Sequence, residues 1–380
     1  MAALDLQSGR VVWKKDTKLP VTGGPGADAN LVMLGTSQGE VVSLAIETGE
    51  ELWRARVSSE ILSSPREADD VVIVRTIDGK IFALNATSGE RLWIYDRTVP
   101  ALTLRGTSTP VIANDLVIAG FDGGRVTALE LKTGKLIWEQ RVAVSRGRSE
   151  LERMVDIDSE PLIVDDVIYV TTFQANVSAI SLESGQILWQ RDISSHSELA
   201  ADQQYLYVTD ENSHVWALDR FSGASIWKQD KLQARRATGP AIIGNKVVVG
   251  DVEGYLHWID KESGQFTARN RLSDEPILTQ AITQDDVLFA YASDGRLAAF
   301  TYVDNGVAIP QQVVVEEEGE QVDVTEDTVS VEKTTETEEE GTSFFGRVLE
   351  IFTAEPEDED EDDEEVPDKE DKMEENTSSK

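Results

Sequence analysis

The chain of 380 residues contains no cysteine. Disulfide bonds, thiolate metal sites and cysteine nucleophiles are therefore excluded, and the absence is compatible with either a reducing or an oxidising compartment. Only three histidines are present, and none stands at the short spacing typical of a zinc site. The sequence accordingly predicts no metal centre and offers no obvious catalytic residue.

Basic residues are scarce relative to acidic ones, with 35 Lys and Arg against 71 Asp and Glu and a formal net charge of −36. This charge repels nucleic acid phosphates and anionic lipid headgroups, so nucleic acid is not expected as a partner. No run of about 18 apolar residues occurs, and residues 1–10 show no basic segment followed by an apolar one. As written, the sequence predicts neither export nor a membrane-spanning segment.

What the sequence does contain is a repeated phrase, a Ser-Gly or Thr-Gly turn followed four residues later by tryptophan in six of its seven copies. The turn glycines are separated by 40, 40, 45, 51, 38 and 41 residues. They are Gly9, Gly49, Gly89, Gly134, Gly185, Gly223 and Gly264. A period near forty is typical of repeat architectures, and short alternating apolar runs between turns indicate antiparallel strands rather than helices.

Each repeat contains four such runs, which predicts an all-β fold, a β-propeller of four-stranded antiparallel blades over residues 1–305. Six complete blades are expected from about residue 21 to 272, followed by three strands without a fourth. Val11–Trp13 could pair with the last unit near Leu297–Tyr302 and close a seven-bladed ring. Otherwise the chain is a shortened eight-bladed propeller, and the pattern leaves both arrangements open.

The repeated tryptophans are expected to be structural. A large flat side chain at the same place in every repeat suits a wedge between neighbouring blades much better than a ligand-binding cage. The residues concerned are Trp13, Trp53, Trp93, Trp138, Trp189 and Trp227.

Two consecutive connectors interrupt the repeat. From the tryptophan of one unit to the proline that opens the next, most gaps are 12 or 13 residues, but two are 17 and 23. These connectors, around residues 97–108 and 144–158, are expected side by side on one rim, because insertions in repeat proteins map to one face.

The composition of the two connectors allows two interpretations. Leu102, Leu104 and Arg105 in the first, with Asp156 and Asp158 in the second, suit a protein-docking site, in which apolar anchors and arginine carry much of the binding energy. Alternatively, the leucines enter the next blade and Arg105 pairs internally with one of the aspartates.

The C-terminal segment has a different composition. Residues 311–380 carry 28 acidic and 5 basic side chains. Residues 306–380 are therefore expected to form a mostly disordered acidic tail. Within the tail, apolar residues of 343–352 fall at helical spacing and predict a short amphipathic helix that could form on contact with a partner.

The residues also resemble a known family. The repeat is similar to the pyrroloquinoline-quinone-like propeller repeat, and the phrases ALTLRGTSTP, ERMVDIDSEP and VVVGDVEGYLHWID resemble the BamB family of the outer-membrane β-barrel assembly machinery. The resemblance covers roughly residues 1–303. It implies an eight-bladed, non-enzymatic scaffold lipoprotein without a cofactor, on the periplasmic side of the outer membrane.

The resemblance also implies partners and a site. The expected partner is the central barrel subunit, bound through its periplasmic polypeptide-transport-associated (POTRA) domains. Unfolded outer-membrane proteins are possible clients. The family's interface residues match Leu102, Leu104, Arg105, Asp156 and Asp158.

Two features depart from the family pattern. The family begins with a signal peptide, a lipid-bearing cysteine and a full first blade, so the membrane anchor is missing from this sequence. The acidic tail is an addition. The alternative function is a quinone-dependent dehydrogenase on the same propeller, although such enzymes commonly stack the cofactor on a cysteine pair that is absent here.

Overall fold

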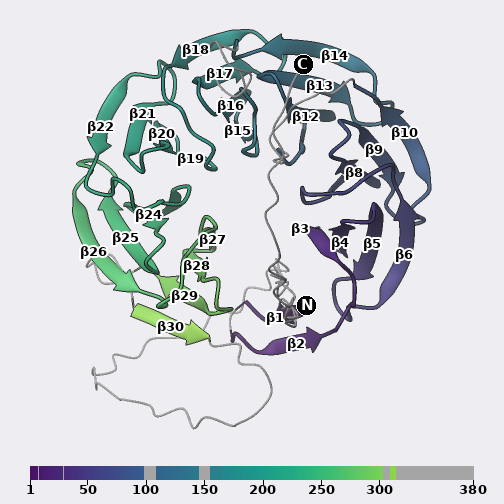
Figure 1. The fold of residues 1–380 in the computed structure, drawn as a ribbon, viewed down its shortest axis with the longest axis horizontal. Coiled ribbons are helices and arrows are strands. Elements are labelled where there is room, and N and C mark those ends of the chain that lie inside the picture. Colours follow the sequence, from purple (N-terminus) through teal and green to yellow (C-terminus); the bar gives the residue numbers. More distant parts are fainter. Residues whose placement is uncertain (7, 29, 98–107, 145–154, 303–308, 314–380) are drawn as a thin grey trace, which may run out of the picture.

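The computed structural model is a ring of sheets arranged radially around a central axis (Figure 1). The structure describes residues 1–6, 8–28, 30–97, 108–144, 155–302 and 309–313. These ranges contain strands and turns, and within them no helix has the length and apolarity needed to cross a membrane. The predicted all-β propeller of four-stranded antiparallel blades is confirmed.

Seven sheets have four antiparallel strands each, and consecutive strands pair in chain order from the axis outward. The strands of the first four are β3 (Val21–Ala27), β4 (Leu31–Thr36), β5 (Glu40–Ala45), β6 (Glu51–Arg56); β7 (Arg66–Ala68), β8 (Val71–Arg75), β9 (Ile81–Asn85), β10 (Arg91–Tyr95); β11 (Val111–Ala113), β12 (Leu116–Phe121), β13 (Arg125–Glu130), β14 (Leu136–Arg141); β15 (Leu162–Val164), β16 (Val167–Thr171), β17 (Val177–Ser181) and β18 (Ile187–Arg191). Those of the last three are β19 (Ala200–Ala201), β20 (Tyr205–Thr209), β21 (Val215–Asp219), β22 (Ser225–Gln229); β23 (Ala241–Ile243), β24 (Lys246–Gly250), β25 (Tyr255–Asp260), β26 (Phe266–Arg271); β27 (Ile282–Gln284), β28 (Val287–Tyr291), β29 (Leu297–Thr301) and β30 (Ile309–Val313).

An eighth, two-stranded sheet closes the ring. It consists of β1 (Ala2–Leu4) and β2 (Val11–Lys14), which pair with each other. Leu4 packs with residues of the β27–β30 sheet, and Ala3 packs with the β3–β6 sheet, so this hairpin fills the space between the last and the first complete blade. The shortened eight-bladed alternative is therefore the one observed.

The alternative in which Val11–Trp13 pairs with Leu297–Tyr302 is wrong. Leu297 stands opposite Val313 of β30, so the outer edge of β29 already has a partner, while β2 pairs with β1. A partner close in sequence closes a shorter loop and costs less chain entropy than one some 290 residues away.

Strand β30 also lies beyond residue 305, in the segment assigned to the tail by its composition. Residues 314–380, including the helix expected at 343–352, lie outside the described residues.

The core lies between adjacent sheets rather than at the axis. In the second strand of each four-stranded sheet nearly every residue is buried, as in β8, because both faces of the sheet are covered by neighbours. The outer strands alternate between partly buried and exposed residues, as in β14. The inner strands are therefore fixed by packing on both faces, whereas the outer strands keep one face accessible to solvent.

Each repeated tryptophan contacts the next sheet in the ring. The indole of Trp53, for example, donates from Nε1 to the carbonyl oxygen of Ala86 at 2.6 Å, and a Cβ on Gly89 would lie 2.6 Å from its ring. Gly89 also has a φ of +71°, which strains any residue with a side chain. The same donor contact to the next sheet is made by Trp13, Trp93, Trp138, Trp189 and Trp227.

Candidate docking site

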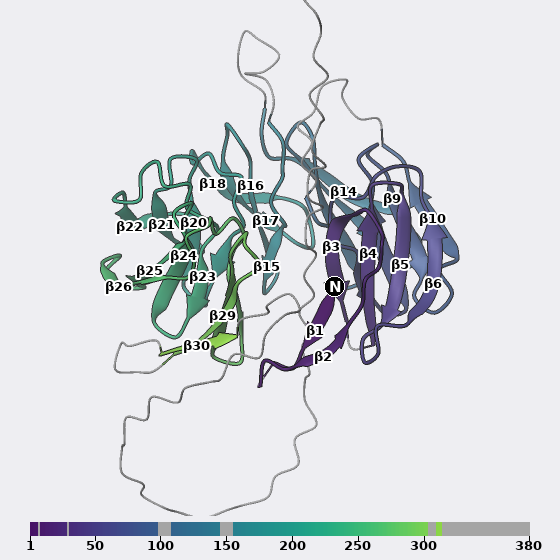
Figure 2. The same cartoon turned by 60° about the horizontal axis from the view of Figure 1, so that its bottom comes forward.

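The two long connectors join the outer strand of one blade to the inner strand of the next. One runs from β10 to β11 and the other from β14 to β15. The seven four-stranded sheets share one strand order, so each of these connectors leaves its blade at an outer strand and reaches the next at an inner strand (Figure 2). Leu102, Leu104 and Arg105 lie outside the described residues, as do residues 145–154. The structure therefore describes two of the five predicted docking residues, Asp156 and Asp158.

The ends at which the two connectors return to the ring lie against each other. The hydroxyl of Ser108 donates to the carbonyl oxygen of Ser159 at 2.8 Å, and both serines are fully buried. A Cβ on Gly120 of β12 would lie 2.4 Å from Ile157 and 3.1 Å from the Ser108 hydroxyl. Both chain ends are thus packed on β12, and the segments that precede them start from neighbouring points.

A buried arginine lies beneath these ends. Arg75, the last residue of β8, is 2% exposed and donates to the carbonyl oxygens of Ser108 and Gly120 at 3.0 and 2.5 Å. Its guanidinium lies 4.7 Å from the centre of the Phe121 ring, and that of Arg97 lies 5.1 Å from the same ring. Burial lowers the pKa of Arg75 to about 10, so the group remains charged at neutral pH.

Three aspartates face this cation, namely Asp122, Asp156 and Asp158. Asp156 is 4% exposed, and its Oδ1 accepts the amide of Gly123 at 3.0 Å. Burial raises the pKa of Asp122 and of Asp158 to about 6, and the positive charge of Arg75 opposes this rise. The site therefore combines a fixed internal cation with carboxylates that are costly to ionise.

Asp158 is distinct because its buried Oδ1 has no hydrogen-bond partner among the described residues. A buried, unpaired carboxylate oxygen loses its hydration without compensation. A cation or hydrogen-bond donor arriving at this point would therefore be favoured. Arg105 of the chain itself and a donor from a partner protein both remain candidates.

The sequence pattern missed Arg75, Phe121 and Asp122, although one signal for Arg75 was present. Arg75 ends an otherwise apolar strand, and its equivalents in the other four-stranded sheets are uncharged. Those equivalents are Gly35, Gly120, Thr171, Thr209, Gly250 and Tyr291. A lone charge at a position that is otherwise small or neutral indicates a specific partner.

The ionisation of Asp158 gives a pH-dependent prediction. The pKa of Asp158 in the folded chain is about 6, above the ordinary value of 3.8. The ionised carboxylate therefore destabilises the fold above pH 6, and this effect disappears as the pH falls toward 4. We expect Asp158→Asn to be more stable than the unchanged chain by about 1–2 kcal/mol at pH 7.5, after discounting for partial exposure, and equal to it near pH 4. Urea unfolding at both pH values measures this difference. A loss of stability at pH 7.5 would instead show that the carboxylate is paired within the chain.

Within the described ranges, no group of three or more histidine, aspartate or glutamate side chains is arranged to hold a metal ion. The described part of the site consists instead of the joined ends of the two connectors, a buried cation and one carboxylate oxygen without a hydrogen-bond partner among the described residues.

The sequence is similar to a known family over most of its length. A sequence model of the family described as "Outer membrane protein assembly factor BamB" matches residues 1–229 and 222–331. A protein of that name from Pseudomonas aeruginosa is 44% identical over 299 residues, covering 79% of each chain. One from Alkalilimnicola ehrlichii is 43% identical over 207 residues, so that match spans about half of each chain.

Solved structures show the same architecture. The crystal structure of BamB from Moraxella catarrhalis superposes with a TM-score of 0.74 at 27% identity, covering 79% of this chain and 90% of that one. A europium-containing methanol dehydrogenase superposes with a TM-score of 0.63 at 13% identity over 79% of this chain and 78% of that one, a likeness of fold alone.

Proposed function

Because the chain belongs to the family of the outer membrane protein assembly factor BamB, we propose that it acts as a non-catalytic scaffold in the assembly of outer-membrane β-barrel proteins. It would work at the periplasmic face of the outer membrane. Its partner would be the central barrel subunit, bound through the periplasmic POTRA domains. Unfolded barrel proteins are proposed as clients.

The observation that carries this proposal is the joint base of the two long connectors. Ser108 and Ser159 are bonded to each other, and Arg75 donates to the carbonyl oxygen of Ser108, so the two connectors return to the ring at neighbouring buried points. Rigid anchoring lowers the ordering cost of binding. Leu102 and Leu104 would fill an apolar pocket of the partner, and Arg105 would pair with its carboxylates.

Binding of the purified POTRA domains to the full chain tests the site. We expect Leu104→Ala and Arg105→Ala each to weaken binding by about 10- to 100-fold, the range for interface anchors of this type. Leu188→Ala and Arg91→Ala are matched controls, since both residues are exposed on outer strands and lie outside the two connectors. These controls should bind like the unchanged chain.

Full binding by both connector variants would remove this site from the proposal. Asp158→Asn should weaken binding if a donor of the partner reaches the unpaired oxygen, whereas unchanged binding would favour its pairing with Arg105. Reduction of a dye by the chain with added pyrroloquinoline quinone and an alcohol would contradict the scaffold proposal and favour the dehydrogenase alternative.

A further inference from the structure

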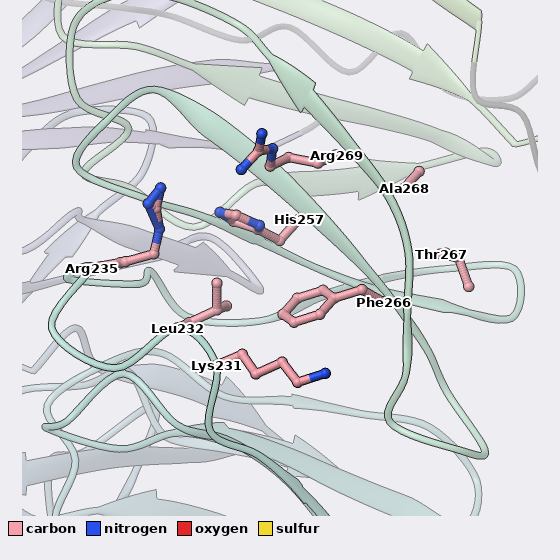
Figure 3. Close-up of a pocket in the computed structure, with 8 residues that line it drawn as sticks. All are labelled: Lys231, Leu232, Arg235, His257, Phe266, Thr267, Ala268 and Arg269. Atoms are coloured by element: carbon pink, nitrogen blue, oxygen red, sulfur yellow. The ribbon is translucent and has the colours of Figure 1, made fainter.

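A second feature lies on a different blade, in a cavity of about 490 Å³ (Figure 3). It is formed by residues 231–235, which connect β22 to β23, and by strands β25 and β26. The docking connectors belong to other sheets, so this cavity is separate from the site proposed above. One of its lining residues, His257, belongs to the phrase GDVEGYLHW, to which the docking function gives no role.

The cavity is basic, although the chain as a whole is strongly acidic. Lys231 and Arg269 are both exposed, and neither makes an ion pair with any described residue. They lie on opposite sides of Phe266 and His257 (Figure 3). A third cation, Arg235, is already engaged with carboxylates. Two positive charges without a carboxylate partner in the described chain therefore frame an aromatic surface.

One wall of the cavity holds a buried histidine. His257 is 4% exposed, and its Nε2 lies 2.7 Å from Oδ2 of Asp251, which is itself fully buried. Burial favours the neutral acid, but hydrogen bonds from His257 and from the Tyr255 amide outweigh it and lower the pKa of Asp251. The ionised Asp251 thus accepts a hydrogen bond from Nε2 and fixes the imidazole. The His257 ring lies 5.8 Å from that of Phe266 between centroids, so the two rings form one aromatic surface of the cavity.

These groups recognise an extended chain of carboxylates. The two cations are separated by an aromatic and apolar surface. Such an arrangement suits a ligand whose carboxylates are spaced along a polypeptide better than it suits a single compact anion. Leu232, which is buried on the same wall, and Phe266 provide contacts for the methylene groups of glutamate side chains. The chemical class is therefore an acidic peptide.

The chain itself contains such a peptide. Of the eleven residues from Glu355 to Glu365, ten are acidic. The described part ends at Val313, in the sheet next to the one that carries the cavity. Tyr302, which follows β29, donates its hydroxyl to Oδ1 of Asn245 at 2.8 Å. The β23–β26 and β27–β30 sheets also share one hydrophobic cluster.

The connecting segment is long enough. Residues 314–354 would span about 35 Å as a flexible chain, compared with about 10 Å between sheets packed face to face. Covalent attachment at this length gives an effective concentration on the order of millimolar, so even weak charge pairing leads to occupancy.

We propose that the cavity formed by Lys231, His257, Phe266 and Arg269 is a binding site for acidic polypeptide, occupied by residues 355–365 of the same chain. The tail then covers a basic surface on an otherwise acidic molecule. A partner with an acidic segment would have to displace the tail to bind there. The proposal is independent of the docking connectors.

The absence of cysteine allows a direct test in the full chain. Nitroxide labels on Gln265→Cys, beside the cavity, and Val366→Cys, at the end of the acidic run, report their separation by electron–electron double resonance. We expect a short-distance population in the unchanged background. Lys231→Glu with Arg269→Glu should reduce that population by about tenfold, since two attractive contacts become repulsive.

The matched control is Arg91→Glu with Lys135→Glu, which makes the same charge change at exposed residues without ion pairs among those described. This variant should keep the short distances. Equal distance distributions in the cavity variant and the control would overturn the proposal, provided that both unfold at the same urea concentration as the unchanged chain. A short distance that disappears on dilution with unlabelled chain would assign the contact to a second copy and overturn its intramolecular form.

Discussion

Replacement of Arg75 by alanine is expected to lower the free energy of unfolding by about 3 kcal/mol at pH 7.5, near the lower end of the range for removing one partner of a buried charge cluster. Two effects contribute. The carbonyl oxygens of Ser108 and Gly120 lose their donor in a buried environment. Asp122 and Asp158 lose the cation that offsets the cost of their ionisation.

The two effects differ in their pH dependence. Without Arg75, the pKa values of Asp122 and Asp158 rise further above 6, so both groups are neutral at pH 5 and the electrostatic part of the loss is small there. The lost hydrogen bonds do not depend on pH. We therefore expect a smaller destabilisation at pH 5 than at pH 7.5, measured by urea unfolding followed through tryptophan fluorescence.

Arg91→Ala is the control for Arg75→Ala, because Arg91 is exposed and makes no ion pair with a described residue. Its effect should stay within about 0.5 kcal/mol. A loss of under 1 kcal/mol for Arg75→Ala, or the same loss at both pH values, would mean that Arg75 does not compensate the carboxylates. Because Arg75 also fixes Ser108, its loss should weaken POTRA binding without any change in the connector sequence.

The fold was largely predictable because each blade repeats the same local information. A turn glycine with positive φ, two alternating apolar runs and a tryptophan define most units, and neighbouring units are alike. The fourth strand of the last blade was not predictable, because Ile309–Val313 has neither the turn nor the tryptophan of the repeat. Pro310 stands opposite Phe300 in this edge strand, where a missing backbone donor is tolerated.

The candidate site was only partly predictable, for a different reason. The lengths of the connectors follow from sequence spacing alone. The place where two long connectors interrupt the repeat could therefore be predicted from the sequence. The base of the connectors is assembled from three sheets: Arg75 comes from one, Phe121 and Asp122 from the next, and Asp158 precedes the third. Residues brought together by the ring have no common spacing in the sequence. That the charge of Arg75 compensates those of the aspartates is therefore seen only in the structure.

The wedge role of the tryptophans is a prediction that one substitution tests. Trp53 is 8% exposed and belongs to a cluster that joins its own sheet to the next one, with Met33 from the former and Phe82 from the latter. We expect Trp53→Ala to cost about 3–5 kcal/mol, the range for a large aromatic residue removed from a core. Equilibrium urea unfolding measures the loss. Leu52→Ala, next to it but 52% exposed, should change stability by under about 0.5 kcal/mol.

Trp53→Phe separates the two contributions of the indole. Phenylalanine retains a ring against Gly89 but cannot donate to the Ala86 carbonyl, so a loss of about 1–2 kcal/mol is expected from the missing hydrogen bond and the smaller ring. The ring closes through the two-stranded β1–β2 sheet, where Trp13 makes the equivalent contact to Ile46. If the tryptophans hold the blades together, Trp53→Ala should lower the urea midpoint of the whole ring in a single transition. The reason is that opening one interface between blades exposes the apolar faces of both blades. A cost under about 1 kcal/mol would show instead that the apolar strand faces hold the blades together and that the repeated tryptophan serves another purpose.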